Sequence, residues 1–254
     1  MSATADRTDV RELADGLWML PGVVNWYLVA DDRGVLILDA GLPRDWDRLL
    51  DALVAIGRTP RDVRGVLVTH GHADHIGIAE QARVTFGVPV LAPAGEERLL
   101  RHPIAGMRSE RPPVLYLRNA SARSAAAAMA RGGSLRPVRI GAWTTVADGE
   151  VLGDLPGAPV AVATPGHTPG HTSYLLPAQR AVLAGDAIVT FDPYTGASGP
   201  RLIARGATWD ASAARASLDR LAELDADLML PGHGEPFAGP VAQAASAARD
   251  AVHP

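Results

Sequence analysis

The chain has 254 residues, a formal net charge of −4, and 47% hydrophobic against 20% charged residues, which is an ordinary composition for a globular protein with a sizeable core. It has no cysteine, and its 24 basic residues are all arginine, which excludes disulfides, cysteine nucleophiles, lysine Schiff bases and a phosphate-binding P-loop. The slightly acidic balance gives no reason to expect nucleic acid or an anionic membrane as a partner.

The beginning of the chain and its apolar runs bear on location. The first 16 residues are polar and of mixed charge, without the apolar region of a signal peptide. The most apolar runs, such as VLILDAG (35–41), are far shorter than a membrane span. We therefore expect a cytoplasmic protein, with residues 1–254 forming one domain, because α/β folds reach this length undivided.

The first hundred residues alternate between strand-like and helix-like patterns. Short runs rich in branched and aromatic residues predict strands, and apolar residues at helical spacing predict helices. We expect strands over residues 16–20, 24–30, 34–40, 65–69 and 88–92. We expect helices over residues 45–57, 74–86 and 94–101.

Residues 102–140 break this alternation. They hold a proline-containing loop and then an alanine-rich helix over 121–131, which Gly132 and Gly133 stop. We interpret the segment as a helical insertion or cap within the domain, not as a linker between two domains.

The rest of the chain returns to the mixed pattern. We expect strands over residues 144–152, 160–164, 172–176, 181–185 and 227–231. We expect helices over residues 210–224 and 239–251. Mixed strands with helices on their outer faces predict a layered α/β sandwich.

Histidines gather in three loops, each of which follows a predicted strand. Six of the eight histidines lie in THGHADH (69–75), TPGHTPGH (164–171) and LPGHGEP (230–236). A fourth loop places Asp186 just past the strand over 181–185. Loops at one edge of a sheet can converge on a common site, with the strands fixing their positions.

The spacing within the first loop suits metal ions. His70 and His72 are two positions apart on an extended segment, so they point to the same side and can hold one ion. Asp74 and His75 follow where a helix is expected to begin, and can face a second ion. Imidazole and carboxylate groups are ligands suited to zinc. Taken singly, Asp74 could instead be a helix N-cap and Asp186 a turn residue, but four such loops in one chain argue against coincidence.

With these motifs the sequence resembles the metallo-β-lactamase-fold superfamily, over about Gly16 to Phe237. HGHADH (70–75) matches the H-x-H-x-D-H signature of that family. TPGHTPGH, GD at 185–186 and PGHG at 231–234 match its later motifs in order. The resemblance implies a four-layer αββα sandwich with two metal ions at one edge.

The resemblance also implies roles for the candidate ligands. One metal ion would be bound by His70, His72 and His167, and the other by Asp74, His75 and His233, with Asp186 bridging the two. Asp39, in LILDAG (36–41), would orient a ligand. His171 would be structural or would support a ligand, while His102 and His253 match nothing in the pattern and are expected to be solvated.

The implied reaction is hydrolysis. Two zinc ions would generate a metal-bound hydroxide near neutral pH, and this hydroxide would attack the carbonyl of an ester, thioester or lactone while Asp74 orients it or moves its proton. Iron or manganese at one or both positions is the alternative metal content. The expected partner is a small-molecule substrate, and the sequence leaves the oligomeric state open.

Other members of the same superfamily offer alternative functions. β-Lactamases of this fold commonly carry Cys or Ser where this chain has Asp186, so antibiotic hydrolysis is disfavoured. Glyoxalase II carries basic residues in its C-terminal part, whereas this chain has only Arg249 after His233. A persulfide dioxygenase with a single iron is the main alternative. An RNA-processing nuclease is less favoured, because the chain has a pI near 6.0 and no basic arm, and a non-catalytic metal module is the least favoured.

The substrate pocket is the least defined part of the site. Candidates to line it come from residues 102–140 and from the segment after Asp186, and they are Met107, Arg108, Tyr116, Leu117, Phe191 and Tyr194. A tyrosine near the metal ions could donate a hydrogen bond to a substrate carbonyl. Arg108 and Arg111 are expected to be solvated.

Overall fold

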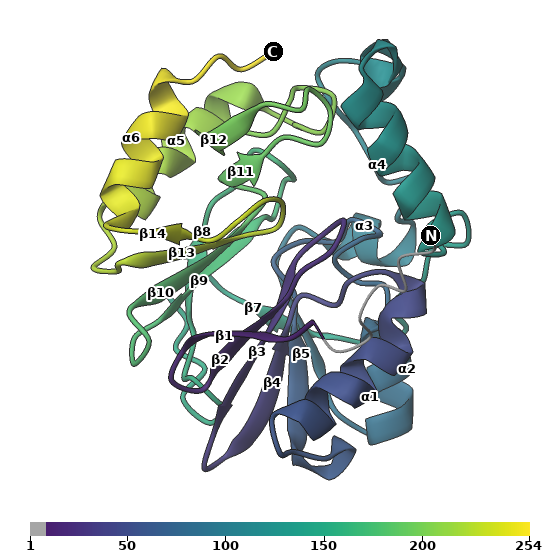
Figure 1. The fold of residues 1–254 in the computed structure, drawn as a ribbon, viewed down its shortest axis with the longest axis vertical. Helices are drawn as coiled ribbons and strands as arrows, with labels where there is room; N and C mark the ends of the chain where they lie inside the picture. Colours follow the sequence, from purple (N-terminus) through teal and green to yellow (C-terminus); the bar gives the residue numbers. More distant parts are fainter. Residues whose placement is uncertain (1–8) are drawn as a thin grey trace, which may run out of the picture.

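The computed structural model describes residues 9–254, and its strands form two stacked sheets and a separate hairpin (Figure 1). The seven-stranded first sheet has the order β1-β2-β3-β4-β5-β6-β7 and the five-stranded second sheet the order β14-β13-β10-β9-β8. The first sheet consists of β1 (Arg11–Ala14), β2 (Leu17–Leu20), β3 (Trp26–Asp31), β4 (Gly34–Leu38), β5 (Val63–Leu67), β6 (Val90–Pro93) and β7 (Thr144–Val146). The second consists of β8 (Val160–Ala163), β9 (Thr172–Leu176), β10 (Ala181–Gly185), β13 (Leu228–Pro231) and β14 (Phe237–Ala238), and the hairpin of β11 (Val189–Phe191) and β12 (Ser198–Arg201).

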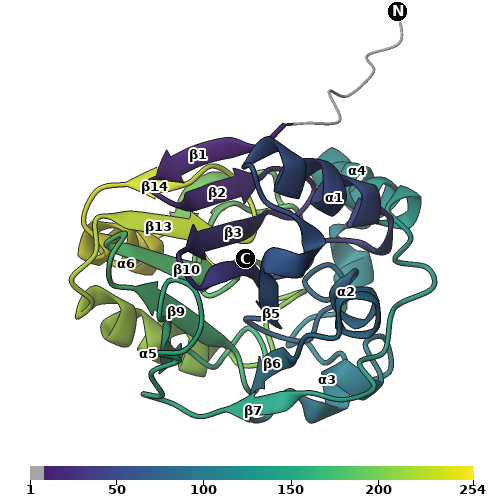
Figure 2. The same cartoon turned by 90° about the horizontal axis from the view of Figure 1, so that it is seen from below.

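Helices cover the outer faces of both sheets, which gives four layers (Figure 2). The first sheet is covered by α1 (Trp46–Ala55) and α2 (Ala79–Phe86), with α3 (Glu97–Arg101) at its edge, and the second by α5 (Ala211–Ala222) and α6 (Val241–Asp250). The remaining helix, α4 (Ala120–Arg131), follows a 3₁₀ helix at Pro113–Arg118 and stands apart from these layers (Figure 1). Short 3₁₀ helices at Pro43–Asp45 and Pro60–Asp62 complete the set. The expected αββα sandwich is confirmed.

The four layers follow from the way in which side chains of the buried strands alternate between the two faces of each sheet. In β4, Val35 and Ile37 pack into the core under α1 and α2, whereas Leu36 and Leu38 pack into the core between the two sheets. Successive side chains of a strand point to opposite faces of the sheet. A strand that is covered on both faces therefore needs apolar side chains at every position. The outward face of β10 packs on α5 and α6 in the same way.

Two predicted elements differ from the structure. The helix expected over 74–86 begins only at Ala79, because the backbone N–H groups of Gly77 and Ile78 donate to the carbonyl groups of Gly41 and Ala40 and not within a helix. The strand expected over 144–152 ends at Val146, because the chain turns at Gly149, whose φ of 76° favours glycine.

Strands β1, β11, β12 and β14 are absent from the predicted elements. Each has four residues or fewer, too short for a reliable alternating pattern. Within residues 9–254, no helix combines the length and the apolarity needed to cross a membrane. The polar N-terminus used to predict location lies partly outside the described residues, so the cytoplasmic location stays a prediction, as does the single-domain organisation.

Candidate metal centre

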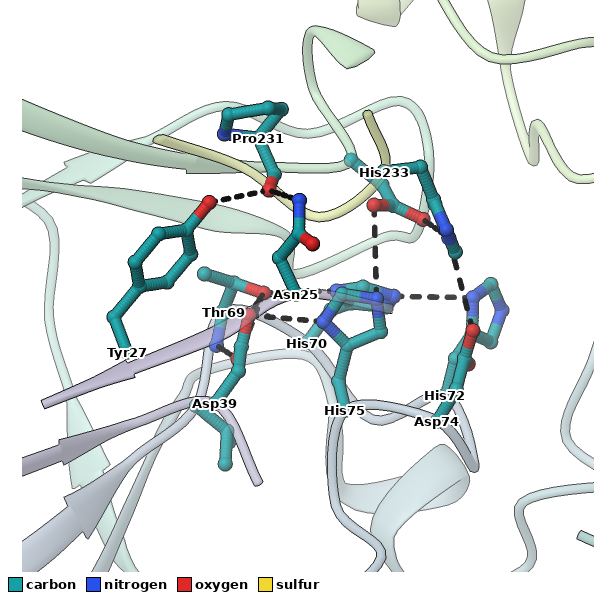
Figure 3. Close-up of polar contacts among 12 residues, drawn as sticks. Asn25, Tyr27, Asp39, Thr69, His70, His72, Asp74, His75, Pro231 and His233 are labelled. Carbon is teal, nitrogen blue, oxygen red and sulfur yellow. Dashed lines mark hydrogen bonds and ion pairs between the residues drawn. The ribbon is translucent and has the colours of Figure 1, made fainter. Parts of the chain in front are cut away.

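All seven candidate ligands lie in loops that follow the carboxyl ends of strands. The loop after β5 carries His70, His72, Asp74 and His75, and the loops after β8, β10 and β13 carry His167, Asp186 and His233. β5 belongs to the first sheet and the other three strands to the second. The two sheets therefore contribute opposite sides of one site, which Figure 3 shows for the loops holding His75 and His233.

Three imidazoles form the first ligand cluster. The Nε2 atoms of His70 and His167 and the Nδ1 atom of His72 lie 2.9–3.1 Å from one another. Two zinc ligands with bonds of about 2.0–2.2 Å at tetrahedral angles lie about 3.3–3.6 Å apart, so this cluster is slightly tighter than a filled site. The three nitrogen atoms point at a common centre.

A second cluster lies beside the first, and Asp186 stands between them. The ligand atoms of Asp74, His75 and His233 lie within 4.8 Å of one another. Asp186 Oδ1 is 3.6 Å from His75 Nε2, and Asp186 Oδ2 is 3.5 Å from His167 Nε2 and 3.4 Å from His233 Nε2. One carboxylate therefore faces imidazoles of both clusters.

These contacts fit a metal pair better than they fit hydrogen bonding. His75 Nε2 and Asp186 Oδ1 are fully buried and have no hydrogen-bond partner among the described residues. A buried polar atom without a partner destabilises a protein by about 1–3 kcal/mol. Their separation of 3.6 Å is too long for a hydrogen bond but matches two ligands of one zinc ion. The donor set of imidazole nitrogens and carboxylate oxygens suits zinc, iron or manganese.

The protonation states of the imidazoles favour metal binding in the first cluster. Burial lowers the pKa of His70, His72 and His167 below the usual range. These rings are therefore neutral near pH 7, which is the form that binds a metal ion. Burial by itself raises the pKa of the Asp186 carboxyl, but His233 and His75 more than offset this and hold the pKa well below its usual range.

Asp39 orients two of the ligands, as expected. The His75 ring donates from Nδ1 to Asp39 Oδ2 at 2.9 Å, which leaves Nε2 free to face the site (Figure 3). The Thr69 hydroxyl lies 3.0 Å from Asp39 Oδ2 and 3.0 Å from His70 Nδ1, so it can donate to the carboxylate and accept from the ring. Partners of this kind fix the tautomer of a ligating histidine.

His171 holds the backbone of Asp186 instead of facing the ligand clusters. Its Nε2 accepts from the Asp186 N–H at 3.2 Å, and its Nδ1 donates to the Thr164 hydroxyl at 2.9 Å. Burial lowers the pKa of His171 to about 3, so the neutral ring can accept at one nitrogen and donate at the other. The choice of His167 over His171 as a ligand stays a prediction, but the geometry favours it.

A glycine makes room for the Asp186 carboxylate. A Cβ atom at Gly232 would lie 2.1 Å from Asp186 Oδ1 and 2.8 Å from His75 Cε1. Both distances are shorter than any non-bonded contact allows. The glycine of PGHG thus leaves space for the Asp186 carboxylate next to His233.

Residues of β3 and the segment before it hold the His233 loop. The Tyr27 hydroxyl donates to the Pro231 carbonyl at 2.7 Å, and Asn25 Nδ2 donates to the Pro231 and Gly234 carbonyls at 3.1 and 2.6 Å (Figure 3). The His233 ring itself donates from Nδ1 to the Val23 carbonyl at 2.8 Å. The run VNWYLVA (24–30) predicts a strand but gives no sign of these roles.

Glu96 is a second feature that the sequence analysis missed. Its side chain is fully buried, and its two oxygens accept from the Gly71 and Gly170 backbone N–H groups, both at 2.8 Å. Gly71 lies between His70 and His72, and Gly170 precedes His171. One carboxylate thus joins the two loops that supply the first cluster. Burial raises the pKa of Glu96, because a buried carboxylate loses the water that would solvate its charge.

The clusters open into a cavity of about 370 Å³. Its floor includes His72, Asp74, His167, Asp186 and His233, and its walls are mostly apolar side chains of residues 102–140 and of the segment 193–207. The wall residues are Val23, Ala73, Met107, Pro113, Val114, Leu117, Ala122, Ala125, Ala126, Met129, Pro193, Tyr194, Ile203 and Ala207. The segment predicted to be a cap therefore forms one side of the cavity.

The other pocket candidates lie elsewhere. Tyr116 packs edge-on against Tyr194 with ring centres 5.5 Å apart, and its hydroxyl donates to the Pro254 carbonyl. Phe191 lies outside this cavity, on a neighbouring surface. Arg108 lines an adjacent cleft.

Of the two histidines expected to be solvated, His102 is exposed. The expectation is wrong for His253. Its ring is partly buried, and Nε2 lies 2.8 Å from the Ile203 carbonyl, because the C-terminal residues fold back onto the segment that forms a cavity wall.

Comparisons with known proteins agree with the motifs. The family model described as "Metallo-beta-lactamase superfamily" matches residues 19–233. The probable metallo-hydrolase YflN of Bacillus subtilis (strain 168) is 25% identical over 239 residues, which cover 85% of this chain and 83% of YflN. The uncharacterized protein YobT of the same organism is 27% identical over 164 residues, covering 65% of this chain and only 61% of YobT. The crystal structure of the metallo-beta-lactamase family protein TTHA1429 from Thermus thermophilus aligns with a TM-score of 0.67 and 26% identity, over 92% of this chain and 78% of that chain.

Glu96→Gln should loosen the first ligand cluster. A glutamine amide can accept at one position only, so its NH₂ group would face one of the two backbone N–H donors. We expect the free energy of unfolding to fall by about 1–3 kcal/mol in chemical denaturation, together with weaker metal binding in a competition titration. Glu97→Gln, on the exposed neighbouring residue, is the control. Wild-type stability and metal affinity in Glu96→Gln would contradict the role given to Glu96.

Gly232→Ala should displace the Asp186 carboxylate, because the added methyl group overlaps Oδ1. We expect elemental analysis of the purified variant to find less metal per chain than in the wild type. Gly153→Ala is the matched control, since a Cβ atom there meets nothing within 4 Å. Equal metal content in both variants and the wild type would show that Gly232 does not shape the site.

Proposed function

The chain belongs to the metallo-beta-lactamase superfamily, and from this we propose that it is a metal-dependent hydrolase that binds two zinc ions and cleaves an ester, thioester or lactone. The observation that carries the proposal is the position of Asp186 between two adjacent ligand clusters, where it also groups with His70 of the first and His75 of the second. An enzyme with a single metal ion needs only one ligand cluster, with one coordination position open to water or substrate. This chain has two ligand clusters. The name of YflN, a probable metallo-hydrolase, supports the reaction class.

We assign the ligands as follows. His70, His72 and His167 would hold the first ion, and Asp74, His75 and His233 would hold the second, with Asp186 shared between them. A bound metal pair would supply Lewis acidity and lower the pKa of water toward neutrality. The protein residues then have to orient the substrate, exclude bulk water and handle the proton.

We assign the proton transfer to Asp74. It is half-buried, lines the cavity and lies with Oδ2 3.7 Å from His233 Nε2. A carboxylate at the boundary between the ligand cluster and the cavity can orient an attacking water molecule and accept its proton. It can then deliver that proton to the leaving group on the cavity side.

We assign the binding of the substrate carbonyl to Tyr194. It lines the cavity together with Asp74 and Asp186. Burial, and then the charges of Asp74 and Asp186, raise the pKa of Tyr194, so its hydroxyl stays protonated and can donate. A donor fixed in a largely apolar cavity stabilises the negative charge that develops on a carbonyl oxygen during attack.

Metal removal tests the proposed function. We expect a strong chelator to abolish hydrolysis of a panel of short thioesters, esters and lactones by the purified protein, and added Zn²⁺ to restore it. Asp186→Asn should retain fewer than two metal ions per chain and lose hydrolysis by at least about a hundredfold. Asp154→Asn, which removes the same charge at an exposed position, is the control. About one iron per chain with no hydrolysis would instead favour the dioxygenase.

Tyr194→Phe should lower kcat while leaving the metal content unchanged. Losing one donor to the developing negative charge should reduce kcat by about ten- to a hundredfold, with a smaller change in KM. Tyr116→Phe is the control, because its hydroxyl donates outside the cavity to Pro254. Equal kcat values for wild type and Tyr194→Phe would remove Tyr194 from the reaction.

A further inference from the structure

A second cleft lies beside the first ligand cluster. It has a volume of about 200 Å³, and His72 and His167 line both this cleft and the main cavity. Its other walls include Arg98, Arg108 and Trp209, and we call it the arginine cleft. The backbone N–H of Trp209 donates to the His167 carbonyl at 3.0 Å, which fixes this wall to the metal centre.

The two arginines in the cleft lack acidic partners. Across residues 9–254, no Asp or Glu lines the cleft. The Arg98 guanidinium donates only to the Ala105 carbonyl, at 3.2 Å, and the Arg108 guanidinium forms no hydrogen bond or ion pair with another described residue. Other arginines of this chain, such as Arg83 and Arg180, are paired with acidic residues. The cleft therefore holds positive charge that the described protein does not neutralise.

The main cavity has the opposite character. No arginine lines it in the part of the chain that the structure describes, and apolar side chains such as Leu117 and Met129 form most of its wall. An anionic group held against this apolar wall, away from the proposed metal ions, would lose its hydration without gaining a cationic partner. An apolar acyl group would instead gain by burial against these side chains.

We propose that the substrate carries an apolar acyl group on one side of the scissile bond and an anionic group, a carboxylate or a phosphate, on the other, and that the arginine cleft binds the anionic group. Guanidinium groups bind both anions through paired N–H donors. Trp209 is 38% exposed and offers a flat apolar surface to the carbon atoms that link the anion to the leaving atom. Because His72 and His167 line both spaces, a substrate that reaches from one to the other passes the first ligand cluster.

This substrate class deepens the proposed hydrolase function and rests on it. Hydrolysis consumes one water molecule: the acyl–sulfur or acyl–oxygen bond breaks, and a carbon–oxygen bond to the acyl group forms. The acyl product leaves as a carboxylic acid. The leaving thiol or alcohol takes the proton and retains the anionic group in the arginine cleft.

Binding of non-hydrolysable thioethers tests the cleft without turnover. The probes are 3-(hexylthio)propionate, its amide, and 3-(hexylthio)propyl phosphate, each titrated into the metal-loaded protein by calorimetry. We expect the wild type to bind at least one anion about two- to twentyfold more tightly than the amide, because the two exposed guanidinium groups contribute about 1.5- to fivefold each. The more tightly bound anion identifies the natural group as carboxylate or phosphate.

Two variants and a control test which residues cause the preference for an anion over the amide. Arg108→Gln should reduce it, and Arg98→Gln with Arg108→Gln should abolish it. Arg111→Gln removes the same charge three positions away, outside both cavities, and should keep it. A preference that persists in the double variant would mean that the anion binds elsewhere, such as at the metal ions, and would overturn the proposal, as would no preference in the wild type.

Hydrolysis measured on the same samples separates the two proposals. The substrates are the hexanoyl thioesters of 3-mercaptopropionate, of its amide and of 3-mercaptopropyl phosphate. Arginine-dependent thioether binding without hydrolysis of any thioester, ester or lactone would refute the proposed function and leave the anion site standing. Hydrolysis with equal KM for the charged and uncharged thioesters in wild type and double variant would keep the function and refute the cleft.

Discussion

Asp186 places a buried carboxylate among His75, His167 and His233, at 3.4–3.6 Å from a nitrogen of each ring, and the surrounding structure maintains this arrangement. The imidazoles come from loops of two different sheets, so the sheets must hold these loops in register against each other. Buried hydrogen bonds hold the loops in this register. Glu96 joins the loops after β5 and β8, Tyr27 and Asn25 hold the loop after β13, and His171 holds the backbone of Asp186 itself. Two buried atoms without a hydrogen-bond partner among the described residues, His75 Nε2 and Asp186 Oδ1, lie 3.6 Å apart, where we propose a metal ion.

The surroundings of the two ligand clusters are strongly asymmetric. Met107 and apolar residues of segments 113–129 and 193–207 line an apolar cavity, whereas Arg98 of α3 and Arg108 of the following loop line the neighbouring cleft. A metal centre between the apolar cavity and the arginine cleft would select a substrate by its apolar end and its anionic end. This selection would not depend on the type of bond that is cleaved. Specificity in this chain would then reside in segments outside the ligand loops, and these can vary without disturbing Asp186.

Much of the architecture was predictable because the signals are local. Buried strands such as β9 and β10 are apolar runs bounded by turn residues, and their predicted limits match the structure. The ligand-type residues were also visible, because HGHADH is dense in metal-binding side chains. Glu96 carried no such signal, since its partners Gly71 and Gly170 are 25 and 74 positions away and are backbone groups. The late start of α2 escaped for the same reason: its backbone groups bond to the loop at 40–41, and local helical spacing cannot reveal a competitor elsewhere in the chain.

The most direct test of the two-metal site is a crystal structure of the zinc-loaded protein, with anomalous diffraction measured on both sides of the zinc absorption edge. We expect two anomalous peaks about 3.5–4 Å apart. One peak should contact His70, His72 and His167, the other should contact Asp74, His75 and His233, and Asp186 should reach both. A single peak at full zinc occupancy, or a second peak that Asp186 does not contact, would contradict the bridging role on which the proposed function depends.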